Sequence, residues 1–353
     1  MPAFQAKEDR PIEVDDADVP HRISTTIQED EGTIEVDADE PDLDDFNAGS
    51  GSTTTSITSS IMKYEFKHGR RYHSDNIGSY PFPNDQAEQD RLDMCHHAFY
   101  RLMNNRLFLA PINPDGMRIL DIGTGTGIWA IQMGDEHPGV ESIVGNDISP
   151  IQPAWVPANV RFVVEDVEMN WIETKPYDFI HCRYMAGSIR DWPRLIKQCY
   201  ANLKPGGWLE LQESVNTLVS EDGSLRPDSH MVRMMETLKE ACNKIGQTMD
   251  PAPNFEQWVE GAGFGTVHKA KFKLPVGTWP RDERLKECGS FMRVNMVEGV
   301  EAFTAALLPD VLGWDHQEVM DLNEAVRKES MKNDMHPLFE YIVFAAQKPL
   351  EES

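Results

Sequence analysis

The chain has 353 residues and carries 59 acidic side chains against 33 Lys and Arg, a formal net charge of −26. This balance argues against general binding to nucleic acid or to an anionic membrane surface, because both require clustered basic side chains. No apolar run reaches the roughly 18 residues that span a bilayer, and the acidic N-terminus lacks the apolar core of a secretory signal. The five Cys residues show no CxxC spacing, so we expect reduced thiols, no metal site and an intracellular location, cytoplasmic or nuclear.

The first sixty residues are predicted to form a disordered acidic tail and a hinge. Residues 1–50 hold 16 acidic and three basic side chains and show no apolar periodicity. They cannot bury enough apolar surface to offset the entropy lost on ordering. The run SGSTTTSITSS (50–60) has the composition of a flexible hinge. Two interpretations stay open: the tail only adds solubility, or it docks protein partners and is regulated by phosphorylation.

Residues 61–353 are predicted to form one domain, in which short apolar strands alternate with helices. A helix over 85–108 belongs to an N-terminal helical flap (61–110). The alternation that follows implies a parallel sheet with helices on both faces. Strands are predicted over 117–123, 141–147, 159–166, 177–182, 208–213, 264–274 and 339–347, and helices over 126–136, 192–203, 228–247 and 255–261. Residues 277–337 are too long for a loop and have helical spacing, which predicts a helical insertion or lid before the last strand.

The sequence LDIGTGTGI (120–128) places a glycine-rich turn between a strand and a helix. Glycines let a backbone bend tightly and approach a ligand. A dinucleotide site prefers GxGxxG spacing, whereas this turn has GxGxG and Asp121 two residues before the first glycine. A carboxylate in that position repels a pyrophosphate and favours a ligand with an ammonium group. S-adenosylmethionine carries an ammonium, a sulfonium and no phosphate.

Two further carboxylates end the next two predicted strands. Asp147 can accept hydrogen bonds from ribose hydroxyls, a role that dinucleotide sites share. Asp166 can take the adenine amino group. Each Asp alone is equally a helix cap or a turn residue. Together with the glycine turn, the three carboxylates predict a site for S-adenosylmethionine.

Several separated blocks resemble one known family. LDIGTGTGIWAI, VGNDISPIQP, YDFIHCRYMAGSIRDWP and LKPGGWLELQE are similar to class I S-adenosylmethionine-dependent methyltransferases, and more narrowly to the fungal LaeA-like methyltransferases of secondary metabolism and development. The segment 69–99 resembles the N-terminal signature of that family. The resemblance implies an α/β fold with a Rossmann-like sheet of seven strands, the last one antiparallel. LaeA itself is better matched by GCGTG than by the GTGTG of this chain, which therefore resembles a paralogue.

The resemblance also implies roles for individual residues around the cofactor. It assigns the methionine and ribose portions to Asp121, Gly123, Thr124, Gly125 and Gly127. It places the ribose at Asp147, and it places the adenine at Ile148, Asp166 and Val167.

The residues that leave the fourth strand are expected at the mouth of the pocket, beside the transferred methyl group. His181 is the candidate general base, although a hydrogen-bonded structural role fits it equally well. Arg183 is predicted to pair with one of the abundant carboxylates, and binding of an acidic substrate is the alternative.

A basic and aromatic segment from Lys67 to Tyr80 stands out in so acidic a chain. One interpretation is a flap over the ligand, with Tyr72 or Tyr80 against the sulfonium in a cation–π contact. The other is a surface segment that pairs with the acidic body. Asp93, His96 and His97 are expected to be ordinary helix positions, because no further metal ligand is indicated.

Two functions are consistent with these features. The first is an enzyme that methylates oxygen or nitrogen of a small molecule in fungal secondary metabolism. The second is a regulatory LaeA-like methyltransferase that acts within a protein complex, recruited through its acidic tail. Methylation of a protein lies between them. Neither hypothesis includes nucleic acid or a membrane as a partner.

Overall fold

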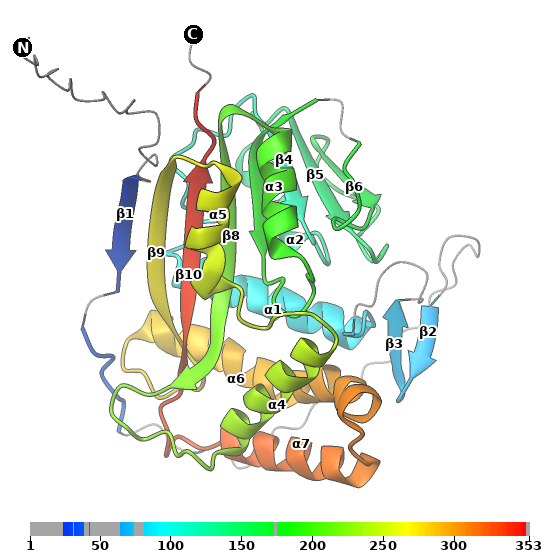
Figure 1. Ribbon diagram of the computed structural model, residues 1–353. Coiled ribbons are helices and arrows are strands. Elements are labelled where there is room, and N and C mark those ends of the chain that lie inside the picture. Colours follow the sequence, from blue (N-terminus) through cyan, green and yellow to red (C-terminus); the bar gives the residue numbers. More distant parts are fainter. Residues whose placement is uncertain are drawn as a thin grey trace, which may run out of the picture.

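The computed structural model describes residues 24–30, 32–38, 42, 64–73, 81–172 and 175–350. A mixed sheet forms one layer, and helices form a second layer below one end of it (Figure 1). The helices are α1 (Gln86–Leu102), α2 (Ile128–Glu136), α3 (Trp192–Asn202), α4 (His230–Lys244), α5 (Phe255–Ala262), α6 (Glu283–Thr304) and α7 (His316–Ser330). Two short helices, Ala252–Asn254 and Leu308–Leu312, connect longer elements.

The sheet has eight strands in the order β1-β9-β10-β8-β7-β4-β5-β6. Their bounds are β1 (Ser24–Glu29), β4 (Arg118–Ile122), β5 (Ser142–Asp147), β6 (Val160–Val164), β7 (Tyr177–Arg183), β8 (Leu203–Val219), β9 (Thr266–Pro275) and β10 (Leu338–Gln347). Strands β4 to β8 pair in parallel, and β10 runs antiparallel between β8 and β9. The predicted Rossmann-like sheet of seven strands, with its last strand antiparallel, is therefore confirmed.

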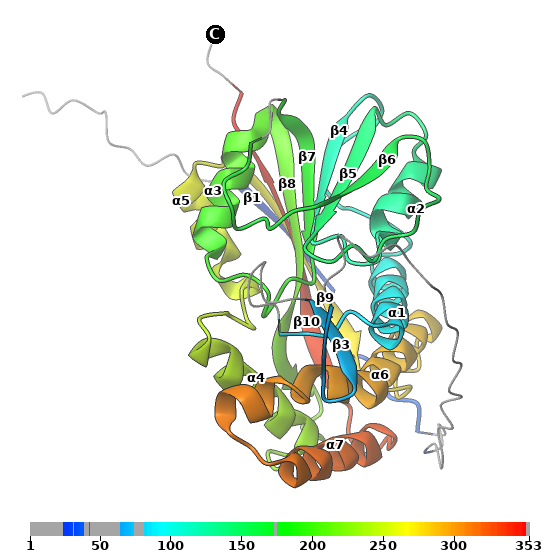
Figure 2. The same cartoon turned by 90° about the vertical axis from the view of Figure 1, so that its right-hand side faces the viewer.

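Alternate residues of the central strands are buried on opposite faces of the sheet. Ile119 packs in the cluster under α2, whereas Leu120 packs in the cluster under α3 and α5. This two-sided burial explains why these strands read as continuous apolar runs rather than as alternating ones. Figure 2 shows α2 on one side of the sheet and α3 with α5 on the other.

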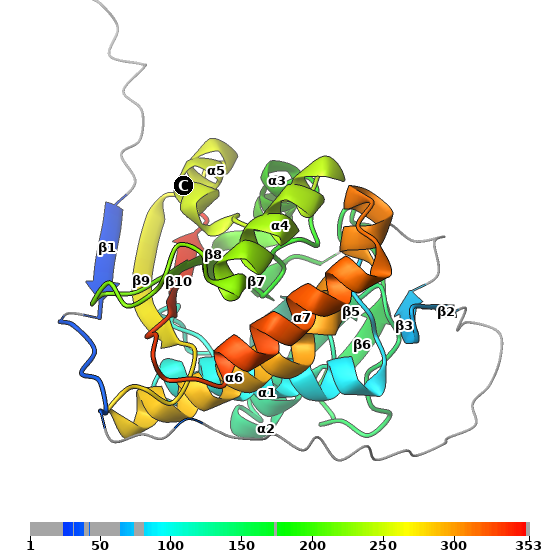
Figure 3. The ribbon, with the colours of Figure 1, turned by 90° about the horizontal axis from the view of Figure 1, so that it is seen from below.

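The insertion over residues 277–337 is helical, as predicted, and consists mainly of α6 and α7. Helix α6 lies along α1, and α7 lies beneath α6 in the second layer (Figure 3). Buried Arg91 of α1 forms an ion pair with Glu88 and donates to Asn295 of α6 at 2.6 Å. The insertion therefore supports α1, and α1 lies between it and the strand ends.

One part of the predicted tail differs from the expectation. Residues Ser24–Glu29 form β1, which pairs in parallel with β9 along the edge of the sheet. The run ISTTI (23–27) is rich in β-branched residues, which favour a strand where an edge is available to pair with. For these residues the prediction of disorder was wrong, because an argument from charge overlooks a short strand. Most of the tail and the hinge lie outside the described residues.

The N-terminal flap also differs in form from the prediction. Ahead of α1 stands a two-stranded hairpin of β2 (Tyr64–Lys67) and β3 (Arg70–His73), so this region is not all helical. No described helix is long and apolar enough to cross a membrane.

Candidate active site

The strands β4, β5, β6 and β7 end at one edge of the sheet, and a cavity opens there beneath α1. Its empty space is about 1090 Å³, part of it open to solvent. The predicted residues that line it share a position at or just after a strand end: Asp121, Gly123, Thr124, Gly125, Asp147, Ile148, Asp166, Val167 and His181. Most of the predicted cofactor positions thus lie around one cavity.

Two positions of the glycine turn leave no room for a side chain. Gly123 has φ +62, and a Cβ there would lie 2.2 Å from Sδ of Met185. Gly127 has φ +83, and its Cβ would lie 2.3 Å from the ring of Phe162. Both conformations disfavour any other residue. Gly127 does not line the cavity, so it serves the close packing of α2 against β6 rather than direct contact with a ligand.

Asp121 is held from two sides at the end of β4. Its Oδ2 accepts from Oγ1 of Thr124 at 2.6 Å, and its Oδ1 accepts from Nδ1 of His181 at 2.7 Å. The second bond follows from register, because Asp121 and His181 are paired residues of β4 and β7. This buried carboxylate keeps a fixed orientation at the cavity wall.

His181 lies deeper than the sequence predicted. Its ring stacks on Trp129, with centroids 3.8 Å apart and planes 4° apart, and the residue is 0% exposed. Among the described residues its Nε2 has no hydrogen-bond partner. The side chain therefore belongs to the inner wall of the cavity, where Nδ1 orients Asp121, and not to the mouth.

Asp147 ends β5 and closes the glycine turn. Its Oδ2 accepts from the amide of Gly125 at 2.9 Å and its Oδ1 from the amide of Ser149 at 2.8 Å. Burial raises the pKa of Asp147 to about 6, with Asp121 contributing, although the two amides oppose the shift. The carboxyl group therefore changes its charge near neutral pH.

The next strand end supplies the third predicted carboxylate. Asp166 follows β6, and its Oδ1 accepts from the amide of Glu168 at 2.8 Å. Val167 is buried beside it and faces the cavity with Ile148. The pair of apolar side chains next to a carboxylate is suited to a flat ring that carries an amino group.

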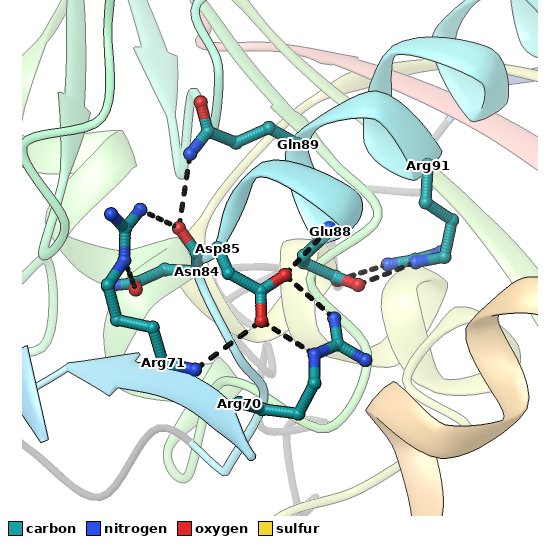
Figure 4. A network of polar contacts seen from close by, with 7 residues as sticks. All are labelled: Arg70, Arg71, Asn84, Asp85, Glu88, Gln89 and Arg91. Carbon is teal, nitrogen blue, oxygen red and sulfur yellow. Dashed lines mark hydrogen bonds and ion pairs between the residues drawn. The ribbon is translucent and has the colours of Figure 1, made fainter. Parts of the chain in front are cut away.

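The hairpin is fastened to the start of α1 by a polar network (Figure 4). Asp85 caps α1 by accepting from the amide of Glu88, and it receives two bonds from Arg70, at 2.6 and 2.9 Å. Arg71 donates to the side chain and carbonyl of Asn84. Asn84 in turn donates to Ser149, which connects this network to the loop after Asp147.

Tyr72 does not reach the cavity. It is buried in the hairpin beside Pro83, and burial raises its pKa to about 12. Because it is not among the lining residues, the structure gives no support to the predicted contact with a sulfonium. Tyr80 lies outside the described residues.

Helix α1 supplies a wall of the cavity that sequence reasoning did not assign. Leu92, Cys95, His96 and Phe99 line it, opposite the strand ends. Nε2 of His96 contacts Oε1 of Gln132 at 2.6 Å. Burial and the neighbouring Arg183 lower the pKa of His96 to about 3, so its ring is neutral. Among the described residues no three His, Cys, Asp or Glu side chains could hold a metal ion.

Comparisons with known proteins agree with this geometry. Residues 94–269 match the family model described as a methyltransferase domain. Methyltransferase pytC of Aspergillus terreus is 64% identical over 92% of this chain and 98% of pytC. The secondary metabolism regulator LAE1 of Cochliobolus heterostrophus is 34% identical over 80% of this chain and 94% of LAE1. The chain belongs to the fungal LaeA-like methyltransferases. It is an S-adenosylmethionine-dependent enzyme of that family.

The sequence identities place this methyltransferase nearer to pytC than to the LaeA regulators. The secondary metabolism regulator laeA of Aspergillus fumigatus is 32% identical over 80% of this chain and 76% of that protein. That value is half of the identity shared with pytC. The difference in the glycine turn was the sequence feature that indicated this.

Proposed function

We propose that this methyltransferase transfers the methyl group of S-adenosylmethionine to oxygen or nitrogen of a small molecule in fungal secondary metabolism. The observation that carries the proposal is the cavity at the strand ends, in which Asp121, Asp147 and Asp166 accompany the glycine turn. The identity to a methyltransferase over nearly its whole length supports it. Three carboxylates beside the glycine turn suit a cationic cofactor without phosphate.

The residues present fit the cofactor part by part. Asp121 would hold the α-ammonium group, because its carboxylate is fixed by Thr124 and His181. Asp147 would accept from the ribose hydroxyls with the lone pairs that its two backbone amides leave free. Ile148, Asp166 and the backbone of Val167 would enclose the adenine.

Catalysis in such a site depends mainly on position. The bound cofactor supplies an activated methyl group, so alignment with the acceptor and exclusion of water provide much of the rate. Trp129, Phe99 and two residues of the turn after β7, Tyr184 and Met185, line the cavity. The amides of Met185 and Ala186 are held by the buried carboxyl of Glu213, at 2.8 and 3.0 Å.

His181 has two proposed roles that use different atoms. As a positioning residue it fixes Asp121 through Nδ1; as a general base it would act through Nε2, the atom without a partner among the described residues. The bond to Asp121 and the stacking on Trp129 favour the positioning role. A base is needed only for an acceptor that is protonated when it binds.

The test of this function is calorimetry with S-adenosylmethionine and with S-adenosylhomocysteine. We expect the wild type to bind both, and Asp147→Ala to weaken both at least tenfold. Absence of binding by the wild type, or equal binding by the variant, would contradict the assigned site.

A second function is favoured by the LAE1 relationship: action through a protein complex. A gene deletion and an Asp121→Ala strain distinguish the two functions by metabolite profiling. Loss of the same methylated product from both strains supports the enzyme. A phenotype confined to the deletion strain supports recruitment of partners. Pull-down with a chain that lacks residues 1–22 would then show whether the partners bind the tail or the folded body.

A further inference from the structure

Arg183 is a cation in the wall of the cavity, and none of the described residues supplies a counterion for it. It is the last residue of β7 and lines the cavity two residues beyond His181. The abundant carboxylates of the chain suggested that one of them would pair with it. No described carboxylate forms an ion pair with Arg183, so that expectation was wrong. The nearest acidic groups are already engaged, Asp121 by His181 and Glu213 by the turn after β7.

The contacts that Arg183 does make carry no negative charge. Its Nη2 donates to Nδ1 of His96 at 2.8 Å, and its Cζ lies 5.5 Å from the ring centre of Phe99. A guanidinium only donates, so Nδ1 of His96 accepts and the proton of that ring lies on Nε2, toward Gln132. Nη1 is buried and has no partner among the described residues. His96 and Phe99 therefore hold the guanidinium in place and leave one donor group unused.

An arrangement of this kind is unfavourable unless something else completes it. A buried charge that lacks a counterion loses hydration without a compensating attraction. Burial accordingly lowers the pKa of Arg183. Residues that carry such an unpaired charge at a cavity wall are suited to meet an ion that arrives with a ligand.

We propose that Arg183 is the anion-binding residue of this cavity and receives a carboxylate or enolate oxygen of a bound ligand. The inference rests on the methyltransferase site proposed above and adds the charge of what the site takes. An oxygen anion beside the part of the guanidinium that lines the cavity would supply the missing counterion.

Two ligands can bring this chemistry. The first is the cofactor, because Asp121 and Arg183 stand at the ends of adjacent strands and offer one negative and one positive group to an α-amino acid. The second is an acidic acceptor, which would bind already ionised and would then need no general base. In both cases the guanidinium faces an oxygen anion at the cavity wall.

The test uses the full chain and two substitutions at the site. Arg183→Met keeps an unbranched stem of four atoms and removes the guanidinium with its charge, whereas Arg183→Lys keeps the charge and removes the planar fork. Arg226→Met is the matched control, because Arg226 is on the surface, pairs with Asp334 and does not line the cavity. Calorimetry compares S-adenosylhomocysteine with 5′-methylthioadenosine, which has the same nucleoside and thioether but no amino acid.

If the anion is the carboxylate of the cofactor, Arg183→Met should lower the affinity for S-adenosylhomocysteine at least tenfold and change the affinity for 5′-methylthioadenosine less than twofold. Arg183→Lys should lower the affinity for S-adenosylhomocysteine by an intermediate factor. An acidic acceptor predicts unchanged affinity for S-adenosylhomocysteine. It also predicts that Arg183→Met no longer transfers the methyl group of radiolabelled S-adenosylmethionine to an acidic acceptor. The acceptor would be supplied as the fraction of a deletion-strain extract that an anion-exchange column retains. Both results support the proposal and identify the source of the anion.

If Arg183 only stabilises the fold, ligand-free Arg183→Met should have a lower melting temperature than the wild type. If its charge is uncompensated in the folded protein, removal of that charge should not lower the melting temperature. A lower melting temperature, with ligand affinity and transfer both unchanged, would overturn the proposal and leave the methyltransferase function standing. If the wild type does not bind S-adenosylhomocysteine, the proposed function fails and this inference fails with it.

Discussion

Two hydrogen bonds orient the carboxylate of Asp121, and this is the main structural argument for its role. Two donors hold its two oxygens, one from the glycine turn and one from the neighbouring strand. Buried carboxylates with fixed hydrogen bonds lose little freedom when a cation docks on them. We therefore expect the hydrogen bonds from Thr124 and His181 to contribute to ligand affinity through Asp121.

Substitution of His181 separates its two roles. In His181→Asn the side-chain amide can replace Nδ1 as the donor to Asp121, whereas His181→Leu leaves that carboxylate with one side-chain donor. We expect affinity for S-adenosylhomocysteine to stay within about fivefold in the first variant and to fall roughly tenfold or more in the second. Both variants lose the stacking on Trp129 and are less stable.

Calorimetry checks these values, and the pH profile of kcat checks the base. If His181→Asn binds normally but has lost an ionisation from its pH profile together with most of its kcat, His181 acts as a base. Equal losses of affinity in the two variants would contradict the positioning role.

Asp147 predicts that ligand affinity depends on pH. Its pKa is raised to about 6, and ribose hydroxyls donate best to the ionised form. Affinity for S-adenosylhomocysteine should therefore be constant above about pH 7 and fall toward tenfold per pH unit well below pH 6. Calorimetry from pH 5 to 8 measures this, and Asp147→Asn is the control, whose affinity should be lower at pH 8 and nearly independent of pH.

The same group affects the stability of the ligand-free protein with a definite sign. Between about pH 4 and 6 the folded protein retains a proton that the unfolded chain has released. The contribution of Asp147 to the free energy of unfolding therefore falls as the pH rises through this window. A profile for Asp147→Asn that keeps the slope of the wild type would show that another group is responsible.

At the scale of elements, the hairpin and α1 depend on one carboxylate. Burial alone would raise the pKa of Asp85, but the hydrogen bonds and charge of Arg70 and the amide of Glu88 hold it below its usual value. Asp85→Ala removes a helix cap and the anchor of Arg70, so we expect a loss of about 1–3 kcal/mol in the free energy of unfolding. Urea unfolding measures this loss.

Arg70→Met is the matched variant for the contact between the hairpin and α1, because it removes the ion pair with Asp85 and keeps the helix cap. Its loss should be smaller than that of Asp85→Ala, and hydrogen exchange should rise in β2–β3 before it rises in α1. Similar hydrogen exchange in the hairpin of the wild type, Asp85→Ala and Arg70→Met would show that the Arg70–Asp85 ion pair does not hold the hairpin in place.

Features that depend on neighbouring residues in the chain were predictable, and features that depend on distant pairs were not. Asp121, Asp147 and Asp166 each follow an apolar run, so strand prediction alone brings them to one edge. The depth of His181 depends on Trp129 in another element. Arg183 and His96 are 87 residues apart, and no spacing in the sequence indicates that they meet. The strand β1 likewise needs the edge of β9.

At the scale of the whole molecule, the acidic N-terminal region is partly neutralised by the body. Glu29 pairs with Lys271 of β9 at 3.1 Å, and Asp37 pairs with Lys286 of α6 at 2.6 Å. The amide of Arg281 donates to the carbonyl of Glu35 at 2.8 Å. Glu29, Glu35 and Asp37 are therefore part of the folded unit, which begins nearer the N-terminus than the composition suggests.

Two truncations test this boundary. Removal of residues 1–22 leaves β1 intact, and we expect the melting temperature to change by less than about 2 °C. Removal of residues 1–40 deletes β1 and its ion pairs and exposes the edge of β9, whose unpaired amides and carbonyls favour association between chains. The melting temperature should then fall by several degrees, and light scattering should show aggregation. Equal stability of the two truncated chains would show that β1 contributes nothing to the sheet, whereas a loss already at residue 22 would move the boundary of the folded unit further toward the N-terminus.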